Sequence, residues 1–347
     1  MCLTDLREKV LTVAVPAYNA EQYLAKCLDS LCRRDFLDKL EIIVVNDGSS
    51  DGTSALAHRY ESEYPASVCV IDKENGGHGS GINTAAAQAR GRYFQVVDSD
   101  DWVISANMPE LLGKLGASDA DVALCNFHMV DMRSGKKQAF QTRGIPPGVV
   151  YSFPEFMKYP RDARDCCFFH GLIYRTEFYR GTGIRLSEKI FYEDQEYATL
   201  PAYYARTVLP LDIFIYQYMV GNTSQSISNE NQVRNIDQIE TVFWNICRFY
   251  CSHRDMTEDK REYFLFKLST LLLSYYVAGL LKDKDRKRGK ARAERMSEAV
   301  KRECPELYDY SRKKYLIARA LHELHISAEM LERAKRTKLY YKIKKHI

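Results

Sequence analysis

The strongest constraint on the fold is an alternation of short apolar runs with segments of helical character near the start of the chain. The continuous apolar runs are 11–15, 41–45 and 68–71, and the segments 20–33 and 54–63 between them are predicted helices. A strand that is apolar on both faces must have both faces covered by other elements. A helix that joins two such strands makes a right-handed crossover, and the two strands are then parallel. The sequence therefore predicts an α/β domain with a mostly parallel central sheet.

Polar or glycine-rich residues follow each predicted strand, at 16–19, 47–53, 72–81 and 98–101. In open α/β sheets, ligands bind beyond the carboxyl ends of the strands. These four segments are therefore predicted to form one binding site at one edge of the sheet.

The most distinctive of these segments is acidic: Val96 and Val97 lead directly into Asp98, Ser99, Asp100 and Asp101. On an extended backbone Asp98 and Asp100 project to the same side and can share one cation, whereas Asp101 points away. Mg²⁺ and Mn²⁺ prefer carboxylate oxygens combined with substrate phosphates. The alternative is an acidic turn that caps the following helix.

A second distinctive segment, 75–81, holds four glycines in seven residues and precedes a predicted helix at 82–90. Glycines allow backbone N–H groups to approach a ligand closely. The spacing matches neither the P-loop pattern nor the dinucleotide-binding pattern, which disfavours a P-loop NTPase or a nicotinamide-binding fold. The alternative is a flexible surface loop.

Taken in order, these motifs closely resemble the donor-domain motifs of family 2 glycosyltransferases. The motifs are Val15-Pro16-Ala17-Tyr18-Asn19, the segment 45–53, Asn75-Gly76-Gly77, Gly91-Arg92-Tyr93-Phe94 and 97–101. The resemblance covers about residues 10–200. It implies a Rossmann-like GT-A fold, a nucleotide-sugar donor, a divalent metal (Mn²⁺ or Mg²⁺) and inversion at the anomeric carbon.

The resemblance also assigns residues. Ala17 and Tyr18 would line the nucleotide pocket, Asp47 would bond the uracil or ribose, Asp98 would lie near the ribose, and Asp100 would ligate the metal. The full donor-binding set is Pro16, Ala17, Tyr18, Asn19, Asp47, Asn75, Gly76, Asp98 and Ser99, and the metal ligands are Asp100 and Asp98. The chain departs from the family pattern at Gly81-Ile82-Asn83, where relatives often have Ala-Arg-Asn, and at His78.

Downstream, Glu193-Asp194 stands among aromatic residues and resembles the catalytic Glu-Asp motif of the family. Asp194 is predicted to be the general base, because a carboxylate near the acceptor hydroxyl can take its proton and partial desolvation would raise its pKa. The alternative is a helix N-terminus where the two acids favour the dipole. His170 is the rival base.

The predicted domains are a GT-A domain at 1–228, with a donor half at 10–105 and an acceptor half at 106–228, and a helical region at 229–347. The span 263–281 is long and apolar enough to cross a bilayer, but Lys267 and three hydroxyl residues interrupt it, which favours a buried helix. Cys247 and Cys251 lie one helical turn apart near His253, and without a fourth ligand we expect burial instead of metal binding.

Charge is distributed unevenly along the chain. From Lys282 onward there are 21 basic and 10 acidic residues, so this segment carries +11 and, because the total is +4, residues 1–281 carry −7. The basic tail, 333–347, suggests peripheral contact with an anionic membrane. No apolar secretory segment opens the chain and the ten cysteines form no C-x-x-C, so we expect a cytoplasmic protein, at the inner face of the membrane.

The predicted function is inverting transfer of one sugar from a nucleotide-diphosphate sugar, UDP-linked by expectation, to a hydroxyl of a glycan or lipid-linked acceptor in cell-surface polysaccharide synthesis. The Gln-x-x-Arg-Trp motif of processive family members is absent. The alternatives are a metal-dependent nucleotidyltransferase, which Glu193-Asp194 disfavours, and a non-catalytic protein that binds nucleotide sugars or glycans. No nucleic-acid partner is expected.

Overall fold

The computed structural model describes residues 9–161, 164, 167–221 and 229–335. The chain divides into two compact units, Met1–Asn222 and Thr223–Ile347. The predicted domain boundary at 228/229 falls beside a stretch outside the described residues, as does most of the basic tail.

The first unit is built on one mixed sheet with the strand order β3-β2-β1-β4-β9-β6-β10-β5. Its first half is parallel, as predicted: β1 pairs with β2 and β4, and β2 with β3. These strands are β1 (Leu11–Ala17), β2 (Leu40–Asp47), β3 (Val68–Lys73) and β4 (Tyr93–Val96). All residues of β1 and β2 are buried, which explains why both read as continuous apolar runs.

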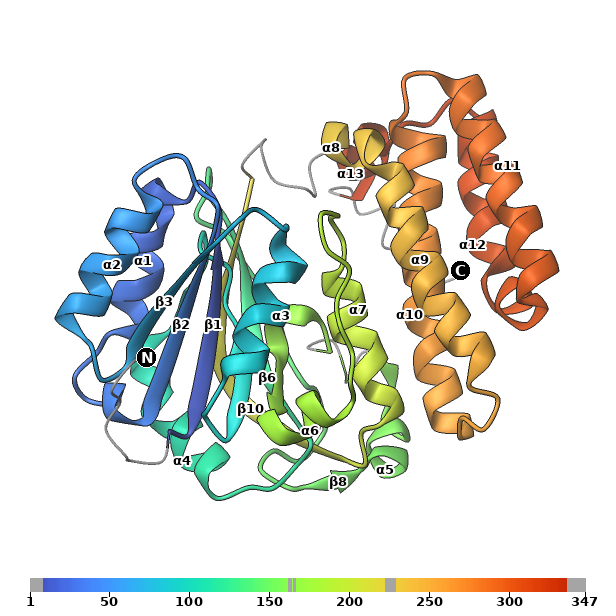
Figure 1. The fold of residues 1–347 in the computed structure, drawn as a ribbon. Coiled ribbons are helices and arrows are strands. Elements are labelled where there is room, and N and C mark those ends of the chain that lie inside the picture. Colours follow the sequence, from blue (N-terminus) through green and yellow to red (C-terminus); the bar gives the residue numbers. More distant parts are fainter. Residues whose placement is uncertain (1–8, 162–163, 165–166, 222–228, 336–347) are drawn as a thin grey trace. The chain divides into compact units, whose positions relative to one another are not determined.

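Helices cover both faces of the parallel half (Figure 1). The helices α1 (Glu21–Leu31) and α2 (Thr53–Glu63) lie side by side over one face, and α3 (His78–Gln88) packs on β1 and β2 from the other. The α/β fold class predicted from the sequence is thus confirmed.

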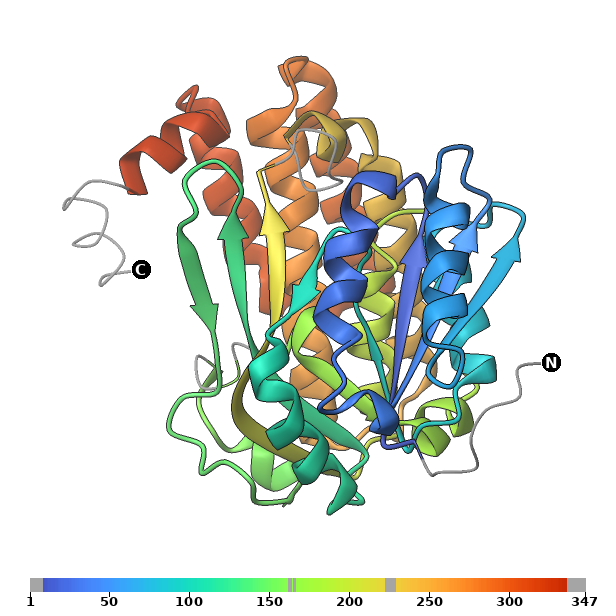
Figure 2. The same cartoon turned by 90° about the vertical axis from the view of Figure 1, so that its left-hand side faces the viewer.

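The second half of the sheet is mixed. β9 (Leu172–Arg175) runs antiparallel to both β4 and β6 (Val122–Asp131), whereas β10 (Thr207–Val220) runs parallel to β6 and antiparallel to β5 (Trp102–Val103). In Figure 2 the green hairpin of β6 and β7 (Lys137–Phe140) stands beside the yellow end of β10. The remaining elements of this half are α4 (Met108–Gly116), β8 (Tyr151–Ser152), α5 (Phe153–Met157), α6 (Thr176–Gly181) and α7 (Asp194–Thr199).

The second unit, where it is described, is helical, as predicted. Its helices are α8 (Asn229–Arg234), α9 (Ile236–Ser252), α10 (Glu258–Val277), α11 (Arg286–Glu303), α12 (Pro305–Glu323) and α13 (Ala328–Lys335). α10 packs on α9 and α12, and α12 also packs on α11. With the π-helical turn that follows it, α10 forms a span, Glu258–Lys282, that is long and apolar enough to cross a membrane, and 72% of its apolar window is buried. That burial is the pattern expected of a core helix.

Candidate active site

The site lies where β1, β2 and β4 end. These strands are parallel neighbours, so the segments that follow them, 18–19, 48–52 and 97–101, emerge at one edge of the sheet. Two more segments reach this edge: the glycine-rich segment 75–81, called the glycine loop below, and the stretch 186–193 ahead of α7. The helix predicted at 82–90 begins earlier, at His78, so the last four residues of the glycine loop form the first turn of α3. The glycine loop and the stretch ahead of α7 are in direct contact: the Lys189 N–H donates to the Gly76 carbonyl at 2.7 Å.

The acidic segment is a turn instead of an extended strand end. The Asp101 N–H donates to the Asp98 carbonyl at 2.9 Å, which closes the turn. Asp101 is 1% exposed; its carboxylate accepts the Tyr216 hydroxyl at 2.7 Å and the Met219 N–H at 2.6 Å. The prediction that Asp101 points away from Asp98 is therefore wrong, because it assumed an extended backbone.

The turn brings together a set of atoms that could hold a metal ion. One carboxylate oxygen each of Asp98 and Asp101 and one ring nitrogen of His170 all lie within 4.8 Å of one another. Burial raises the pKa of Asp101 well above its usual range, and the charges of Asp98 and Asp100 raise it further. A cation would relieve that repulsion, and carboxylates with an imidazole are suitable ligands for Mn²⁺.

Asp100, the predicted metal ligand, lies half-buried in the same turn but is not a member of this group of three. Its role as a ligand therefore stays a prediction. His170 lies against the rings of Phe127, Tyr216 and Tyr218. Burial lowers the pKa of His170 to about 4, so the imidazole is neutral at neutral pH, the form that ligates metals.

His78 links the acidic turn to the predicted catalytic pair. Its Nε2 lies 2.9 Å from an Asp98 carboxylate oxygen and its Nδ1 lies 2.6 Å from a Glu193 carboxylate oxygen. Burial by itself would lower the pKa of His78, but the charges and hydrogen bonds of Asp98 and Glu193 raise it well above its ordinary value. His78 thus bridges two carboxylates that are 95 positions apart in the sequence.

The two acids of the predicted catalytic pair, Glu193 and Asp194, have different surroundings. Glu193 is 3% exposed and contacts His78, whereas the Asp194 carboxylate accepts the side-chain amide of the neighbouring Gln195 at 2.9 Å. Burial and the Glu193 charge raise the pKa of Asp194 to about 6, in the predicted direction. Asp194 is also the first residue of α7, so the expected helix N-terminus is present as well.

On the nucleotide side, Asp47 organises the glycine loop. One of its carboxylate oxygens accepts the Lys73 ammonium at 2.7 Å and the Gly76 N–H at 2.9 Å, and the other accepts the Gly77 N–H at 2.7 Å. The Asn75 side chain donates to the Asp47 carbonyl. The contact predicted between Asp47 and uracil or ribose stays a prediction; in this structure the carboxylate holds the loop in place.

Two glycines of this segment, Gly77 and Gly79, leave no room for a Cβ atom. Gly77 has φ +84°, and a Cβ there would lie 2.8 Å from the Lys189 amide nitrogen. A Cβ on Gly79 would lie 2.2 Å from the Ser187 carbonyl oxygen. These two glycines are therefore required by the close packing of the loop against 186–190, a stretch that precedes the catalytic pair.

The other predicted donor-binding residues line the ends of β1 and β4. Pro16 and Ala17 are buried, Tyr18 is 55% exposed, and Ser99 is half-buried in the acidic turn. Asn19 has φ +48°. Its side-chain oxygen accepts the Ser50 N–H at 2.9 Å, and this hydrogen bond joins the segment after β1 to the segment after β2. Their contacts with a donor stay predictions.

Sequence reasoning did not assign the two residues that connect the site, His78 and Tyr216. His78 stood out only as a departure from the family pattern, and nothing marked it as a partner of Glu193. The Tyr216 hydroxyl donates to Asp101 and accepts the Asp98 N–H at 3.0 Å, from a strand more than a hundred positions away. A signal for Tyr216 was missing because the register of β10 cannot be read from the sequence.

Comparison with known proteins gives a consistent result. A family model described as Glycosyl transferase family 2 matches residues 12–186. The Bacillus subtilis protein named uncharacterized glycosyltransferase EpsJ is 30% identical over 213 residues, 60% of this chain and 60% of that protein. The Staphylococcus aureus (strain Mu50) poly(ribitol-phosphate) beta-N-acetylglucosaminyltransferase TarS is 26% identical over 220 residues, 63% of this chain and 37% of that protein.

Solved structures support the same fold. Residues 1–349 of S. aureus TarS, in a complex with UDP-GlcNAc, superpose with a TM-score of 0.61 at 20% identity, over 90% of each chain. The mannosyltransferase PcManGT from Pyrobaculum calidifontis, in a complex with GDP-Man and Mn²⁺, superposes with a TM-score of 0.55 at 18% identity, over 92% of this chain and 88% of that one. The first unit thus has the GT-A fold.

Proposed function

The chain belongs to glycosyl transferase family 2, and from that premise we propose that it transfers one sugar from a nucleotide-diphosphate sugar to an acceptor hydroxyl, with inversion, in the synthesis of a cell-surface polysaccharide. The proposed donor is UDP-linked and the acceptor a glycan or a lipid-linked glycan. The relationship to the N-acetylglucosaminyltransferase TarS supports this donor class.

The observation that carries the proposal is that one histidine, His78, contacts both acidic segments. His78 holds Asp98 of the turn and Glu193 of the catalytic pair, so a donor bound at the turn lies near the next residue, Asp194. Glycosyl transfer needs these two functions side by side: a site for the leaving diphosphate and a base for the attacking hydroxyl.

In the proposed reaction, Asp194 takes the proton of the acceptor hydroxyl while the oxygen forms a bond to the anomeric carbon. The bond from that carbon to the diphosphate oxygen breaks, and the diphosphate leaves with the electron pair. A carboxylate with a pKa of about 6 is ionised at neutral pH and is more basic than an ordinary aspartate. Glu193 is less suited to this role because it already accepts from His78.

The acidic turn fits a divalent cation, and we propose Mn²⁺ or Mg²⁺ there. Asp98 and Asp101 with neutral His170 offer one group of ligand atoms, and the predicted pair Asp98 and Asp100 offers another from the same turn. Such an ion, when bound, stabilises the charge that develops on a diphosphate leaving group.

The experiment that tests the function is a donor screen. The purified protein is incubated with a panel of nucleotide sugars, Mn²⁺ and candidate acceptors, and the released nucleoside diphosphate is measured for wild type and Asp194→Asn. We expect release with one donor, dependent on an acceptor and lost in the variant. Release of pyrophosphate would instead indicate a nucleotidyltransferase, and no product with any pair would support a binding protein.

For location, we propose a cytoplasmic enzyme in peripheral contact with an anionic membrane through its basic tail. Six basic residues, Lys335, Arg336, Lys338, Lys342, Lys344 and Lys345, alternate there with apolar ones, and each basic residue near an anionic surface contributes about 1 kcal/mol. Deleting residues 333–347 should reduce co-sedimentation with anionic liposomes, and added salt should do the same to the full chain. Unchanged co-sedimentation would contradict the proposal.

A further inference from the structure

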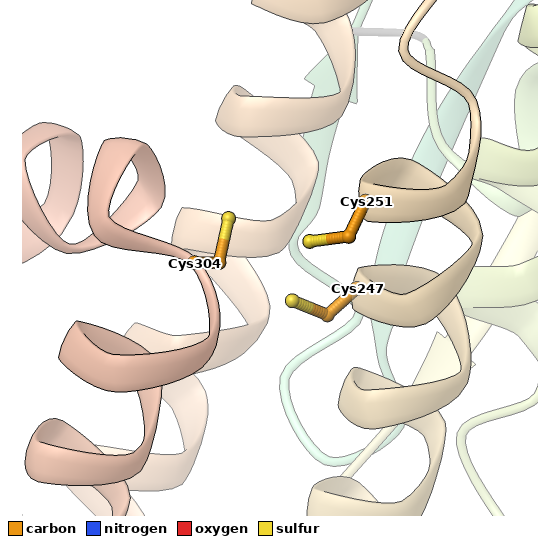
Figure 3. Close-up of side chains that lie close together, drawn as sticks. All are labelled: Cys247, Cys251 and Cys304. Atoms are coloured by element: carbon orange, nitrogen blue, oxygen red, sulfur yellow. The ribbon is translucent and has the colours of Figure 1, made fainter.

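Three cysteines of the helical unit converge on one point. The Sγ atoms of Cys247, Cys251 and Cys304 all lie within 4.8 Å of one another. Figure 3 shows the three side chains directed toward one another, two from α9 and one from the junction of α11 and α12. The sequence indicated only the first two, because Cys304 is more than fifty positions away.

Local structure explains the convergence. Cys247 and Cys251 are four positions apart on α9, so their side chains leave the same face of the helix on successive turns. Cys304 is the single residue between α11 and α12 and serves as the N-cap of α12. Packing within the unit then brings the α12 start against α9, where the Tyr250 hydroxyl donates to Glu306 at 2.8 Å.

The three cysteines differ in their exposure to solvent. Cys247 is 1% exposed and Cys304 is 4% exposed, whereas Cys251 lies at the surface. Two ligands would therefore be shielded from solvent, and the third would border a position that water can reach.

The spacing of the sulfur atoms suits a thiophilic ion. With Zn–S bonds of about 2.3 Å, two sulfur ligands of tetrahedral zinc lie roughly 3.8 Å apart. Separations within 4.8 Å reach that value by small side-chain rotations. The neighbouring oxygen and nitrogen groups have other partners: Glu306 accepts from Tyr250 and Arg261, and the His253 Nδ1 lies 2.8 Å from the Phe249 carbonyl oxygen.

The electrostatics agree with this geometry. Hydrogen bonding from Cys247 lowers the pKa of the Cys304 thiol to about 6, while hydrogen bonding to Cys304 and burial raise that of Cys247. Cys304 lies both at the C-terminus of α11 and at the N-terminus of α12, so the two helix dipoles act on it in opposite directions.

We propose that Cys247, Cys251 and Cys304 bind one Zn²⁺ ion through three sulfur atoms, with water in the fourth position on the side of Cys251. As the three Zn–S bonds form, the protons that remain on the thiols are released to solvent. The ion joins α9 to the start of α12. This site is independent of the divalent metal proposed for the acidic turn, which has carboxylate ligands and lies in the other unit.

Cobalt distinguishes the two sites, because only thiolate ligands give a sulfur-to-cobalt charge-transfer band. The full-length chain, purified with reductant and stripped of metal, is titrated with Co²⁺ and then with Zn²⁺. We expect the band to saturate at one equivalent and to disappear when Zn²⁺ displaces Co²⁺. Cys251→Ser is the decisive variant, because this residue lies at the surface and its substitution leaves the buried packing intact; it should lose the band.

The matched control is Cys69→Ser, which changes a half-buried cysteine of the other unit and should keep the band. Zinc should raise the melting temperature of the wild type and of Cys69→Ser, but not that of Cys251→Ser. The proposal is overturned if the wild type gives no band, or if the band persists in Cys251→Ser. It is also overturned if mass spectrometry of the metal-free protein, under reducing conditions, finds two of the three cysteines joined in a disulfide.

Discussion

The two acidic segments of the active site hold their charges in different ways. In the turn, Asp101 is fixed by a tyrosine hydroxyl and a backbone N–H, and Asp98 is fixed by His78. In the predicted catalytic pair, Glu193 is fixed by the same histidine, whereas the Asp194 carboxylate accepts a hydrogen bond from the adjacent Gln195.

This difference corresponds to two chemical functions, cation binding and proton transfer. Hydrogen bonds hold the carboxylates of the turn in a fixed place, where a cation could bind and relieve the burial and like-charge repulsion that raise the pKa of Asp101. A desolvated carboxylate with a weakly held position has a raised pKa and can take a proton. The difference supports the proposal that the turn holds a cation and that Asp194 takes the proton, and the following substitutions test that proposal.

The largest effect is expected from Asp100→Ala. If the turn places a cation on the diphosphate, loss of this ligand should reduce turnover by roughly 10³-fold or more while the fold is kept, because a half-buried turn residue contributes little to the core. Metal-dependent release of nucleoside diphosphate and the circular dichroism spectrum measure the two quantities. Full activity of this variant in EDTA would remove the turn from the mechanism.

Asp194→Asn is expected to reduce kcat by roughly 10²–10⁴-fold, because the amide keeps the shape of the side chain but cannot accept the proton. Affinity for the nucleotide sugar, measured by calorimetry, should stay close to that of the wild type. Glu193→Gln is the paired variant, and it should reduce kcat less than Asp194→Asn does. A near-normal kcat for Asp194→Asn would make His170 the next residue to test.

His78→Gln should affect stability more than a surface histidine does. It removes the cation between two carboxylates of which one is buried, so the free energy of unfolding should fall by about 1–3 kcal/mol. His58→Gln is the matched control, because His58 also lies between two carboxylates, Glu61 and Asp72, but is 46% exposed; its effect should stay within about 1 kcal/mol. Equal losses in urea denaturation would show that the His78 link contributes no more than a surface pair.

The smallest effect concerns pH. The base acts when it is ionised, and burial raises the pKa of Asp194 to about 6, so kcat should be full above this pH and fall about tenfold per unit below it. The pH profile of kcat measures this, with Asp194→Asn as the control that should lack the acidic limb. If kcat instead fell only below about pH 4, His170 would be the candidate base, because its pKa is lowered to about 4.

The parallel half of the sheet could be predicted because each of its strands is buried on both faces and is followed at once by its binding segment. The mixed half could not, because the direction of β9 and the register of β10 depend on contacts between segments far apart in the chain. The same reason explains the individual misses. Asp101 was misplaced because one hydrogen bond bends the backbone into a turn, and Cys304 joins its partners only through the packing of helices.

The glycine loop has a consequence for engineering donor preference within the family. Gly77 and Gly79 pack against the backbone at Lys189 and Ser187 so closely that neither surface can change alone. If the glycine loop were replaced by that of a relative, the new loop would clash with the backbone at 186–190 or leave a gap there. Either change would displace the stretch that leads to Asp194. Recombination between relatives should therefore exchange 75–81 and 186–190 as one inherited block, although more than a hundred residues separate them in the gene.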